Sequence, residues 1–472
     1  MTTWQSVTVG VPCGAGQYCD ASAACVQGCF NNGHHVHGTV NPSNACEECT
    51  ATSDRGWEAT PGTSCENGGV CSTDGACLNP LSISAGFGHT CALTPTGVMK
   101  CWGENQHGQL GDGTTETRTM PTEVLDLGVD VKAFSAGFGG STCAVTATGK
   151  EMCWGSNHFG QIGDGNYNAD SNPAPIPVLA SGVSMYEPVT ISVGEGHVCA
   201  VGSEGNVRCW GHNTFGEVGA DVLDAPTDVC GYSGSGGAVA FPCVLAPHLF
   251  TPPFGLAGVA VGWEHTCGRT SANSVVCWGR NDGGQLGDSV PNTHLPTTVM
   301  IDGTTLDAVG QISAGSNHTC AVTAKSDAVC WGNNGRNQLG DSDTGAHGPR
   351  RVEALAGEVI AISAGGARAC EGFTCALTRE RGVKCWGNNA MGQLGDGTNT
   401  DSIVPRQVQG LTAGVVAVSA GGCHTCALAT TGSVKCWGEN THGELGDGTT
   451  SGQPGPGVSK YRSTPVTVVG FP

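Results

Sequence analysis

Charged residues are scarce in this chain, and most of those present are acidic. Lys and Arg number 20 of 472 residues against 40 Asp and Glu, a formal net charge of −20. Proteins that bind nucleic-acid backbones or anionic membranes use clustered Lys and Arg. We therefore expect neither nucleic acid nor an anionic membrane as a partner. No apolar run approaches the roughly 18 residues of a membrane-spanning helix, so we also expect no membrane insertion.

Familiar catalytic patterns are missing as well. The sequence contains neither "GxSxG" nor "HExxH", the motifs of a serine hydrolase elbow and a zinc protease. No Ser, His and acid set stands out, and the glycine-rich segments lack the lysine and helix of a phosphate-binding loop. We expect a protein without enzymatic activity, cofactor or bound metal.

Glycine and cysteine, by contrast, are abundant, at 77 and 27 residues. High glycine with few charges favours short strands and tight turns over long helices. So many cysteines require either metal binding or an oxidising compartment. The first ten residues, "MTTWQSVTVG", lack the basic and apolar regions of a secretory signal, so we expect any signal to have been removed from this chain.

One pattern recurs seven times. In "HTCALTPTGVMKCWGENQHGQLGDGTT" (89 to 115) two cysteines lie ten residues apart, and the second is followed by Trp-Gly and a glycine-rich tail. The same spacing joins Cys91 to Cys101, Cys143 to Cys153, Cys199 to Cys209, Cys267 to Cys277, Cys320 to Cys330, Cys375 to Cys385 and Cys426 to Cys436. The period is 51 to 56 residues, with one of 68 in the third copy. Such a period is typical of propeller blades.

The cysteine pairs are best explained as disulfides. A turn at Thr96 places Cys91 opposite Cys101 and Leu93 opposite Met99 in an antiparallel hairpin, within reach of an S–S bond. Zinc ligands normally lie two to four residues apart, and each copy offers only two cysteines. The Trp after each pair should fill the space between neighbouring blades. In five copies a histidine stands two residues before the first cysteine of the pair: His89, His197, His265, His318 and His424. We expect these imidazoles to be buried and hydrogen-bonded to the main chain.

The pattern "SAG..HTCAL…G.V.CWG.N..GQLGDGT…P" resembles the repeats of the regulator of chromosome condensation family, and the paired cysteines resemble its secreted bacterial branch. This resemblance implies an all-β fold: a seven-bladed β-propeller of four-stranded blades over residues 80–472. Nuclear family members exchange nucleotide on a small GTPase, whereas a secreted bacterial relative inhibits enzymes through its propeller face. An acidic, cysteine-rich chain is closer to the second.

Four more cysteines fall in loops of this propeller. Cys230 and Cys243 bracket the insertion "GYSGSGGAVAFP", and we expect them to bond to each other. Cys370 and Cys423 occupy equivalent loops of blades six and seven, which predicts a disulfide between blades.

Departures from the repeat gather in the loop before each first cysteine. In a repeat fold, binding residues should differ from copy to copy, and equivalent loops of a propeller emerge on one face. Aromatic, acidic and Arg side chains at such positions are typical of protein-binding surfaces, although ordinary loop drift would also vary them. The predicted binding residues are Phe87, Phe138, Glu195, Trp263, Glu264, Asn317 and Arg368.

The front of the chain lacks the repeat. Residues 29–79 form a cysteine-rich module, and residues 1–28 echo only its second half, so we expect the chain to begin within a first module of a longer protein. "GHHVHG" places His34, His35 and His37 together, for which a solvated loop is favoured over a zinc site. The whole predicts a secreted or cell-surface scaffold that binds a protein through loops on one face. The alternative is a structural subunit of an extracellular fibre or surface layer, which would self-assemble.

Overall fold

The computed structural model describes residues 82–471, apart from gaps at 95, 129–130, 180–186, 220–227, 235–236, 251, 253, 288–289, 344, 368–369 and 451–460, together with ten short strands between residues 12 and 78. The chain divides into two compact units, with the boundary after Leu81. None of the described helices is long and apolar enough to cross a membrane.

Seven antiparallel sheets follow one another along the second unit, each a blade built from one continuous segment. Blades one and two are β11 (Ile83–Ala85), β12 (His89–Leu93), β13 (Met99–Gly103) and β14 (Arg118–Glu123), then β15 (Val131–Ala136), β16 (Ser141–Thr146), β17 (Glu151–Asn157) and β18 (Asn168–Pro177). Blade three contains β19 (Pro188–Val193), β20 (His197–Gly202) and β21 (Val207–His212), and blade four β24 (Leu256–Val261), β25 (His265–Thr270), β26 (Val275–Gly279) and β27 (Thr293–Thr298). Blade five is β30 (Val309–Ala314), β31 (His318–Thr323), β32 (Ala328–Gly332) and β33 (His347–Arg351), and blade six β34 (Val359–Gly365), β35 (Phe373–Thr378), β36 (Val383–Gly387) and β37 (Ser402–Gln407). Blade seven is β38 (Val415–Ala420), β39 (His424–Ala429), β40 (Val434–Glu439) and β41 (Tyr461–Thr467).

Blade three departs from the four-stranded plan. Its outer edge is a long hairpin of β22 (Asp228–Gly234) and β23 (Gly237–Phe250), so the sheet order is β19-β20-β21-β23-β22. The insertion that bears Cys230 and Cys243 thus adds a fifth strand. A small hairpin of β28 (Met300–Ile301) and β29 (Thr304–Thr305) precedes blade five, and the 3-10 turn η2 (Glu353–Leu355) follows it.

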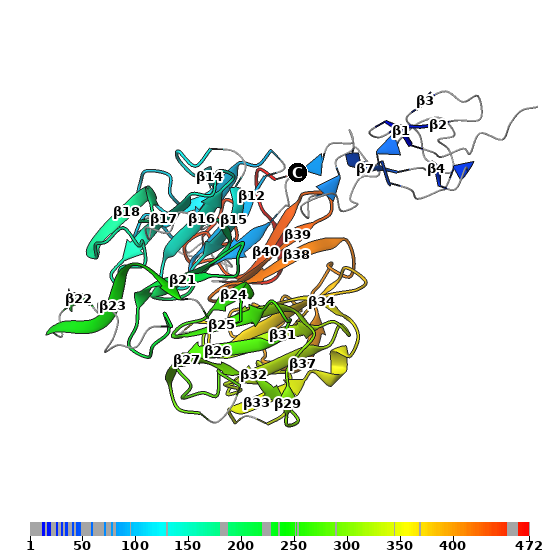
Figure 1. Cartoon of the computed structure of the whole chain (residues 1–472). Coiled ribbons are helices and arrows are strands. Elements are labelled where there is room, and N and C mark those ends of the chain that lie inside the picture. Colours follow the sequence, from blue (N-terminus) through cyan, green and yellow to red (C-terminus); the bar gives the residue numbers. More distant parts are fainter. Residues whose placement is uncertain are drawn as a thin grey trace, which may run out of the picture. The chain divides into compact units, whose positions relative to one another are not determined.

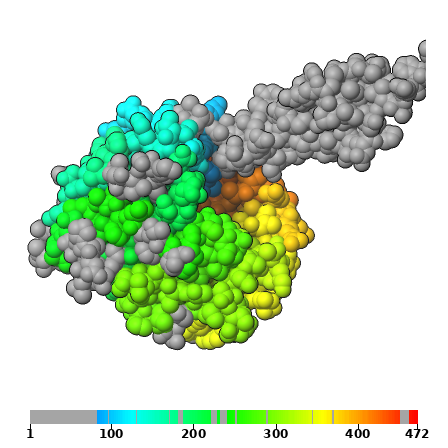
Figure 2. All heavy atoms as spheres, viewed as in Figure 1, coloured from blue at the N-terminus to red at the C-terminus, as the bar shows by residue number. Residues whose placement is uncertain are grey.

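The seven blades close into a ring. Figure 1 shows the orange strands β38, β39 and β40 of the last blade beside the blue strand β12 of the first, and β11 contacts both β38 and β39. The colours in Figure 2 run around the ring in chain order. The seven-bladed propeller predicted from the repeat is confirmed.

A ring of glycines lines the inside of this closure. In each blade a glycine stands at the end of the innermost strand or directly after it. A Cβ added to this glycine would lie no more than 2.9 Å from the carbonyl oxygen of the equivalent glycine in the next blade, around the full circle of Gly86, Gly137, Gly194, Gly262, Gly315, Gly365 and Gly421. Any side chain there would collide with backbone, which explains the "SAG" glycine of the repeat.

The serine of "SAG" also acts between blades. Its hydroxyl accepts a hydrogen bond from a main-chain N–H of the following blade, as in Ser84 to Ala136 and, across the closure, Ser419 to Ala85, both 2.9 Å. Each Trp donates its indole N–H to a carbonyl of the preceding blade. For Trp102 the acceptor is the oxygen of Glu444, at 2.8 Å. All seven indoles are fully buried, so the predicted wedge between blades is confirmed.

The five histidines make a bond that the sequence did not suggest. Each imidazole Nε2 lies 2.7 to 3.0 Å from a threonine hydroxyl of the next blade, as in His89 to Thr142. The expected burial is confirmed, but the partner of Nε2 is a side-chain hydroxyl and not the main chain. Each of these threonines donates its single proton to a carbonyl oxygen of the histidine's blade, Gln109 in this case, so the imidazole must donate through Nε2.

Nine disulfides join cysteines in the described part of the chain. Seven are the hairpin pairs, with Cα atoms 4.1 Å apart. In blade one Cys91 faces Cys101 and Leu93 faces Met99, the predicted register. Cys230 bonds to Cys243 within the β22–β23 hairpin, and Cys370 bonds to Cys423 between blades six and seven.

The first unit contributes small sheets of two or three short strands to the described residues. In two of them cysteine lies opposite cysteine: Cys19 faces Cys25 between β2 (Gln17–Cys19) and β3 (Cys25–Val26), and Cys71 faces Cys77 between β9 (Val70–Cys71) and β10 (Cys77–Leu78). The side chains of His34, His35 and His37, for which the sequence favours a solvated loop over a zinc site, lie outside the described part.

Candidate functional site on one face of the propeller

Two loops of every blade meet on one face, which we call the loop face. The first loop joins the innermost strand to the second and precedes the first cysteine. The second follows Trp-Gly. In all seven blades the residue after Trp-Gly donates its main-chain N–H to a carbonyl in the first loop, at 2.7 to 3.1 Å, for example Glu104 to Gly88 and Arg280 to Glu264. The repeat therefore brings fourteen loops onto the loop face.

Most of the predicted binding residues line two cavities on the loop face. Phe87, Phe138, Glu195 and Trp263 border the smaller one, about 250 Å³, and Trp263 and Asn317 border the larger one, about 370 Å³. Trp263 thus belongs to both.

Two predicted residues stand apart from these cavities. Glu264 lines neither and instead forms an ion pair with Arg280. Arg368 lies outside the described residues.

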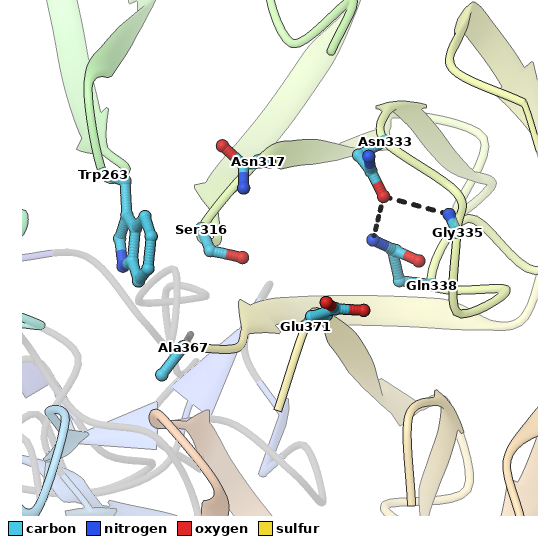
Figure 3. A pocket seen from close by; sticks show the side chains of 8 residues that line it. All are labelled: Trp263, Ser316, Asn317, Asn333, Gly335, Gln338, Ala367 and Glu371. Atoms are coloured by element: carbon cyan, nitrogen blue, oxygen red, sulfur yellow. Dashed lines mark hydrogen bonds between the residues drawn. The ribbon is translucent and has the colours of Figure 1, made fainter. Parts of the chain in front are cut away.

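The larger cavity is polar and spans blades four to six (Figure 3). The indole of Trp263 stands on one side, and Ser316, Asn317 and Asn333 follow along the wall. The Asn333 Oδ1 accepts hydrogen bonds from the main-chain N–H of Gly335 at 2.9 Å and from the Gln338 side chain at 3.0 Å. Glu371 completes the rim, where an ion pair of 2.8 Å with Arg336 connects blades five and six.

The smaller cavity combines aromatic walls with carboxylates, and its lining comes from blades one, two, three and four. Its lining consists of Phe87, Glu104, His107, Gln109, Phe138, Gly139, Gly140, Glu195 and Trp263. Among these described lining residues there is no Lys or Arg. The Phe87 ring is the most exposed of the aromatic groups, at 40%.

Acidic groups concentrate where blade seven meets blade one. Burial raises the pKa of Glu104, as do the neighbouring carboxylates Glu444 and Glu439, while His442 opposes the rise. The hydrogen bond between His442 Nδ1 and Glu444 Oε1, 3.1 Å long, raises the pKa of His442. One histidine therefore faces three carboxyl groups, and acidic side chains outnumber basic ones in this part of the loop face.

Other ionisable groups of the face are already paired. His212 and Glu217 form a buried ion pair in blade three. Arg280 binds Glu264 and Asp282 and lies over the Phe215 ring, 5.2 Å from its centre. Burial lowers the pKa of His107, as does the neighbouring His158, so His107 is neutral at pH 7.

The sequence predicted binding residues in the loop before each first cysteine, but none in the loop that follows Trp-Gly. Glu104 and His107 line the smaller cavity and Asn333 the larger. The signal was present, because the residue after Trp-Gly also differs from copy to copy: Glu104, Ser156, His212, Arg280, Asn333, Asn388 and Glu439. In the described part of the chain, no cluster of His, Cys, Asp or Glu is suited to hold a metal ion.

Comparison with known proteins identifies the repeat. A family model described as "RCC1-like domain" matches residues 81–370, and models of the regulator of chromosome condensation (RCC1) repeat match residues 359–393, 383–428 and 415–444. The chain belongs to the RCC1-like propeller family. The ultraviolet-B receptor UVR8 of Arabidopsis thaliana is 32% identical over 376 residues, which cover 78% of this chain and 79% of the receptor.

More distant relatives share the fold. The human E3 ubiquitin-protein ligase HERC2 is 28% identical over 364 residues, or 75% of this chain, but these cover only 7% of the ligase. Yeast RCC1 (Prp20), solved bound to Kap60, superposes with a TM-score of 0.63 at 19% identity, covering 83% of this chain and 84% of that one. Human WBSCR16 gives 0.60 at 18% identity, covering 83% and 97%.

Proposed function

We propose that this RCC1-like propeller is a secreted or cell-surface scaffold without enzymatic activity that binds a protein partner through its loop face. The observation that carries the proposal is that recurring and varying residues of the repeat have different roles. The recurring Gly, Ser, His, Thr and Trp residues hold blade to blade, whereas the residues that vary gather around two cavities on one face.

The composition of the loop face supports a protein partner. Phe87, Phe138 and Trp263 supply apolar area at its centre, and charged groups such as Glu371 and Arg336 form a rim. Aromatic anchors inside a polar rim are the usual anatomy of a protein interface. Two solved relatives bear protein partners in their titles: yeast RCC1 bound to Kap60, and Prp20p with its binding to Gsp1p and histones.

The disulfides support secretion and kinship with the secreted bacterial branch. Nine bonds within the described residues would not persist in a reducing cytosol. Mass analysis of the native protein after thiol alkylation, without reductant, tests this proposal. We expect these eighteen cysteines to stay unmodified, and their alkylation in native material would contradict an oxidising compartment.

Partner capture tests the loop face. A Phe138→Ala/Trp263→Ala protein should lose capture of the wild-type partner from a cell-surface extract. The matched control is Val189→Ala/Leu295→Ala, which removes two exposed apolar side chains from elsewhere on the propeller. If the Phe138→Ala/Trp263→Ala protein still captures the partner, the proposal that the loop face binds it is refuted. Ordered multimers of the native protein, seen in negative-stain images with no captured partner, would favour the structural-subunit alternative.

A further inference from the structure

The smaller cavity of the loop face offers an unusual combination of groups. Three aromatic rings, Phe87, Phe138 and Trp263, share its lining with two carboxylates, Glu104 and Glu195. At about 250 Å³ it falls below the roughly 300–1,000 Å³ of pockets that take a whole drug-sized ligand. A cavity of this size accommodates a single side chain.

Carboxyl groups outnumber basic groups around this cavity. His212, whose pKa Glu195 helps to raise, is hydrogen-bonded to Glu217. The carboxylate of Glu104 lies near those of Glu439 and Glu444, and His442, which faces the same group, is hydrogen-bonded to Glu444. Arg280, a cation of the neighbouring blade four, is bound to Glu264 and Asp282. A cation entering the cavity would relieve repulsion between the carboxylates and would also be attracted by the faces of the aromatic rings.

Two glycines allow close contacts beside this cavity. A Cβ on Gly88 would lie 2.6 Å from the Glu104 Oε2, and a Cβ on Gly139 would strike the main-chain carbonyl of Glu195. Neither glycine has the positive φ that would require it on backbone grounds. The small size of Gly88 therefore allows the Glu104 carboxylate to approach, and that of Gly139 allows the main chain of Glu195 to approach.

A buried hydrogen-bond donor without a partner lines the same cavity. Gln109 is fully buried, and its Oε1 accepts the main-chain N–H of His107 at 2.9 Å, but its Nε2 has no acceptor among the described residues. In blades two, five and six the equivalent glutamine donates to the side chain five residues earlier. In blade one that residue is Glu104, and no such bond forms. A buried amide left unpaired is costly, so a ligand with an acceptor group is expected to occupy this place.

We propose that the smaller cavity binds one basic side chain, lysine or arginine, of a protein partner. The cationic head lies between Glu104 and Glu195 and against Phe87, Phe138 and Trp263. Gln109 donates its Nε2 hydrogen bond to a carbonyl oxygen of the bound segment. The net charge of −20 attracts basic segments to the protein as a whole. This inference rests on the proposed function and specifies the partner's chemistry.

The test uses short peptides and the intact chain. Acetyl-Gly-Lys-Gly-amide and acetyl-Gly-Arg-Gly-amide are titrated by NMR against acetyl-Gly-norleucine-Gly-amide, which keeps the aliphatic stem and lacks the charge. We expect at least one basic peptide to bind about tenfold or more tightly than the neutral one. Equal affinities, or no binding of either basic peptide, would overturn the proposal.

Variants assign the binding to the cavity. Glu104→Gln keeps the side-chain shape and should weaken the basic peptide about tenfold or more, and Phe87→Ala, an exposed ring whose loss the fold tolerates, should weaken it as well. The matched control is Glu204→Gln, which removes one carboxylate at an exposed hairpin turn between β20 and β21 and should change affinity less than about twofold. Equal effects of Glu104→Gln and Glu204→Gln would show that the peptide responds to the overall charge of the protein and not to the cavity, which would contradict the proposal.

Partner capture separates the two proposals. If Phe138→Ala/Trp263→Ala abolishes capture while Glu104→Gln and the basic peptides have no effect on it, the cation site is refuted and the loop face stands. If the peptides bind in a charge-dependent way but capture survives every loop-face substitution, the proposed function is refuted and the cation site stands.

Discussion

The imidazole Nε2 of His424 lies 2.7 Å from the hydroxyl of Thr90, a contact that joins residues 334 positions apart and ties the last blade to the first. Thr90 passes its own proton to the carbonyl of Glu444, which also accepts the indole N–H of Trp102. Three buried polar groups of two blades are satisfied at this one junction. The closure therefore depends on side chains as well as on backbone contacts.

Replacing Thr90 by Val should destabilise the ring. The substitution keeps the shape but leaves His424 Nε2 buried without an acceptor, at an expected cost of about 2–3 kcal/mol in the free energy of unfolding. Thr425→Val is the matched control, because Phe373 takes the histidine position of the preceding blade and Thr425 donates only to the Gln393 carbonyl. Its expected cost is about 1 kcal/mol. Denaturant titrations compare the two, and equal costs would contradict the role of the His–Thr pair.

The five buried histidines predict acid sensitivity. Burial lowers the pKa of His89 and His265 to about 3 and of His318 and His424 to about 4, and places that of His197 well below its usual value. The unfolded chain takes up protons below about pH 6.5 while the folded protein does not, so stability is complete above pH 6.5 and is lost as pH falls toward 4. Each imidazole can contribute a slope of at most about 1.4 kcal/mol per pH unit in this window.

The contribution of one histidine can be isolated. His318→Phe copies the natural Phe373 of the next blade and should reduce the slope between pH 6 and pH 5 by about 1.2 kcal/mol per unit, whatever its effect at pH 7.5. Unfolding free energies at these three pH values measure it. An unchanged slope would show that the imidazole titrates normally in the folded state.

The glycine ring predicts a sharp contrast between two substitutions. In Gly421→Ala the new methyl group would lie 2.5 Å from the Gly86 carbonyl oxygen, where only backbone movement could relieve it, and we expect a loss of about 2–3 kcal/mol. Gly258→Ala places a methyl group where no atom lies within 4 Å and should be neutral or stabilising by up to about 1 kcal/mol. Thermal unfolding of both proteins decides, and comparable losses would contradict the close-packed ring.

The buried ion pair between Glu151 of blade two and Arg208 of blade three should contribute little to the free energy of unfolding. Glu151 and Arg208 are 2.6 Å apart with side chains 4% and 7% exposed, and Glu151 occupies a position held by Val207 and Val275 in the next two blades. Arg208→Met would strand the carboxylate at a cost of about 3–5 kcal/mol, whereas Glu151→Val/Arg208→Val should be near the wild type or more stable. A double variant as unstable as the single one would contradict this interpretation.

The features that could be predicted from the sequence are those that depend on residues close together in the chain. The Cys91–Cys101 bond follows from a spacing of ten about a three-residue tip, and the propeller follows from seven such units. The His–Thr pairs could not be read locally, because they join residues 53 to 334 positions apart. One trace of them exists: Ser141 replaces histidine in blade two where Val198 replaces threonine in blade three.

The same limit applies to the site. Varying loops before each first cysteine pointed to Phe87, Phe138 and Trp263, because topology alone brings equivalent loops to one face. Glu104 and Gln109 were not predicted. Glu104 joins the aromatic residues in the cavity lining through its main-chain hydrogen bond to Gly88, which the sequence does not show. Gln109 is of interest because its Nε2 has no hydrogen-bond acceptor, which only the packed structure reveals.

Hydrogen–deuterium exchange of the native protein with its captured partner tests the central claim most directly. Our account predicts slowed exchange in the first loops of blades one to five, residues 86–88, 138–140, 194–196, 262–264 and 315–317, and unchanged exchange in the hairpin turns at residues 147–150, 203–206 and 271–274. Protection confined to the hairpin turns, with the loop-face segments unaffected, would contradict it.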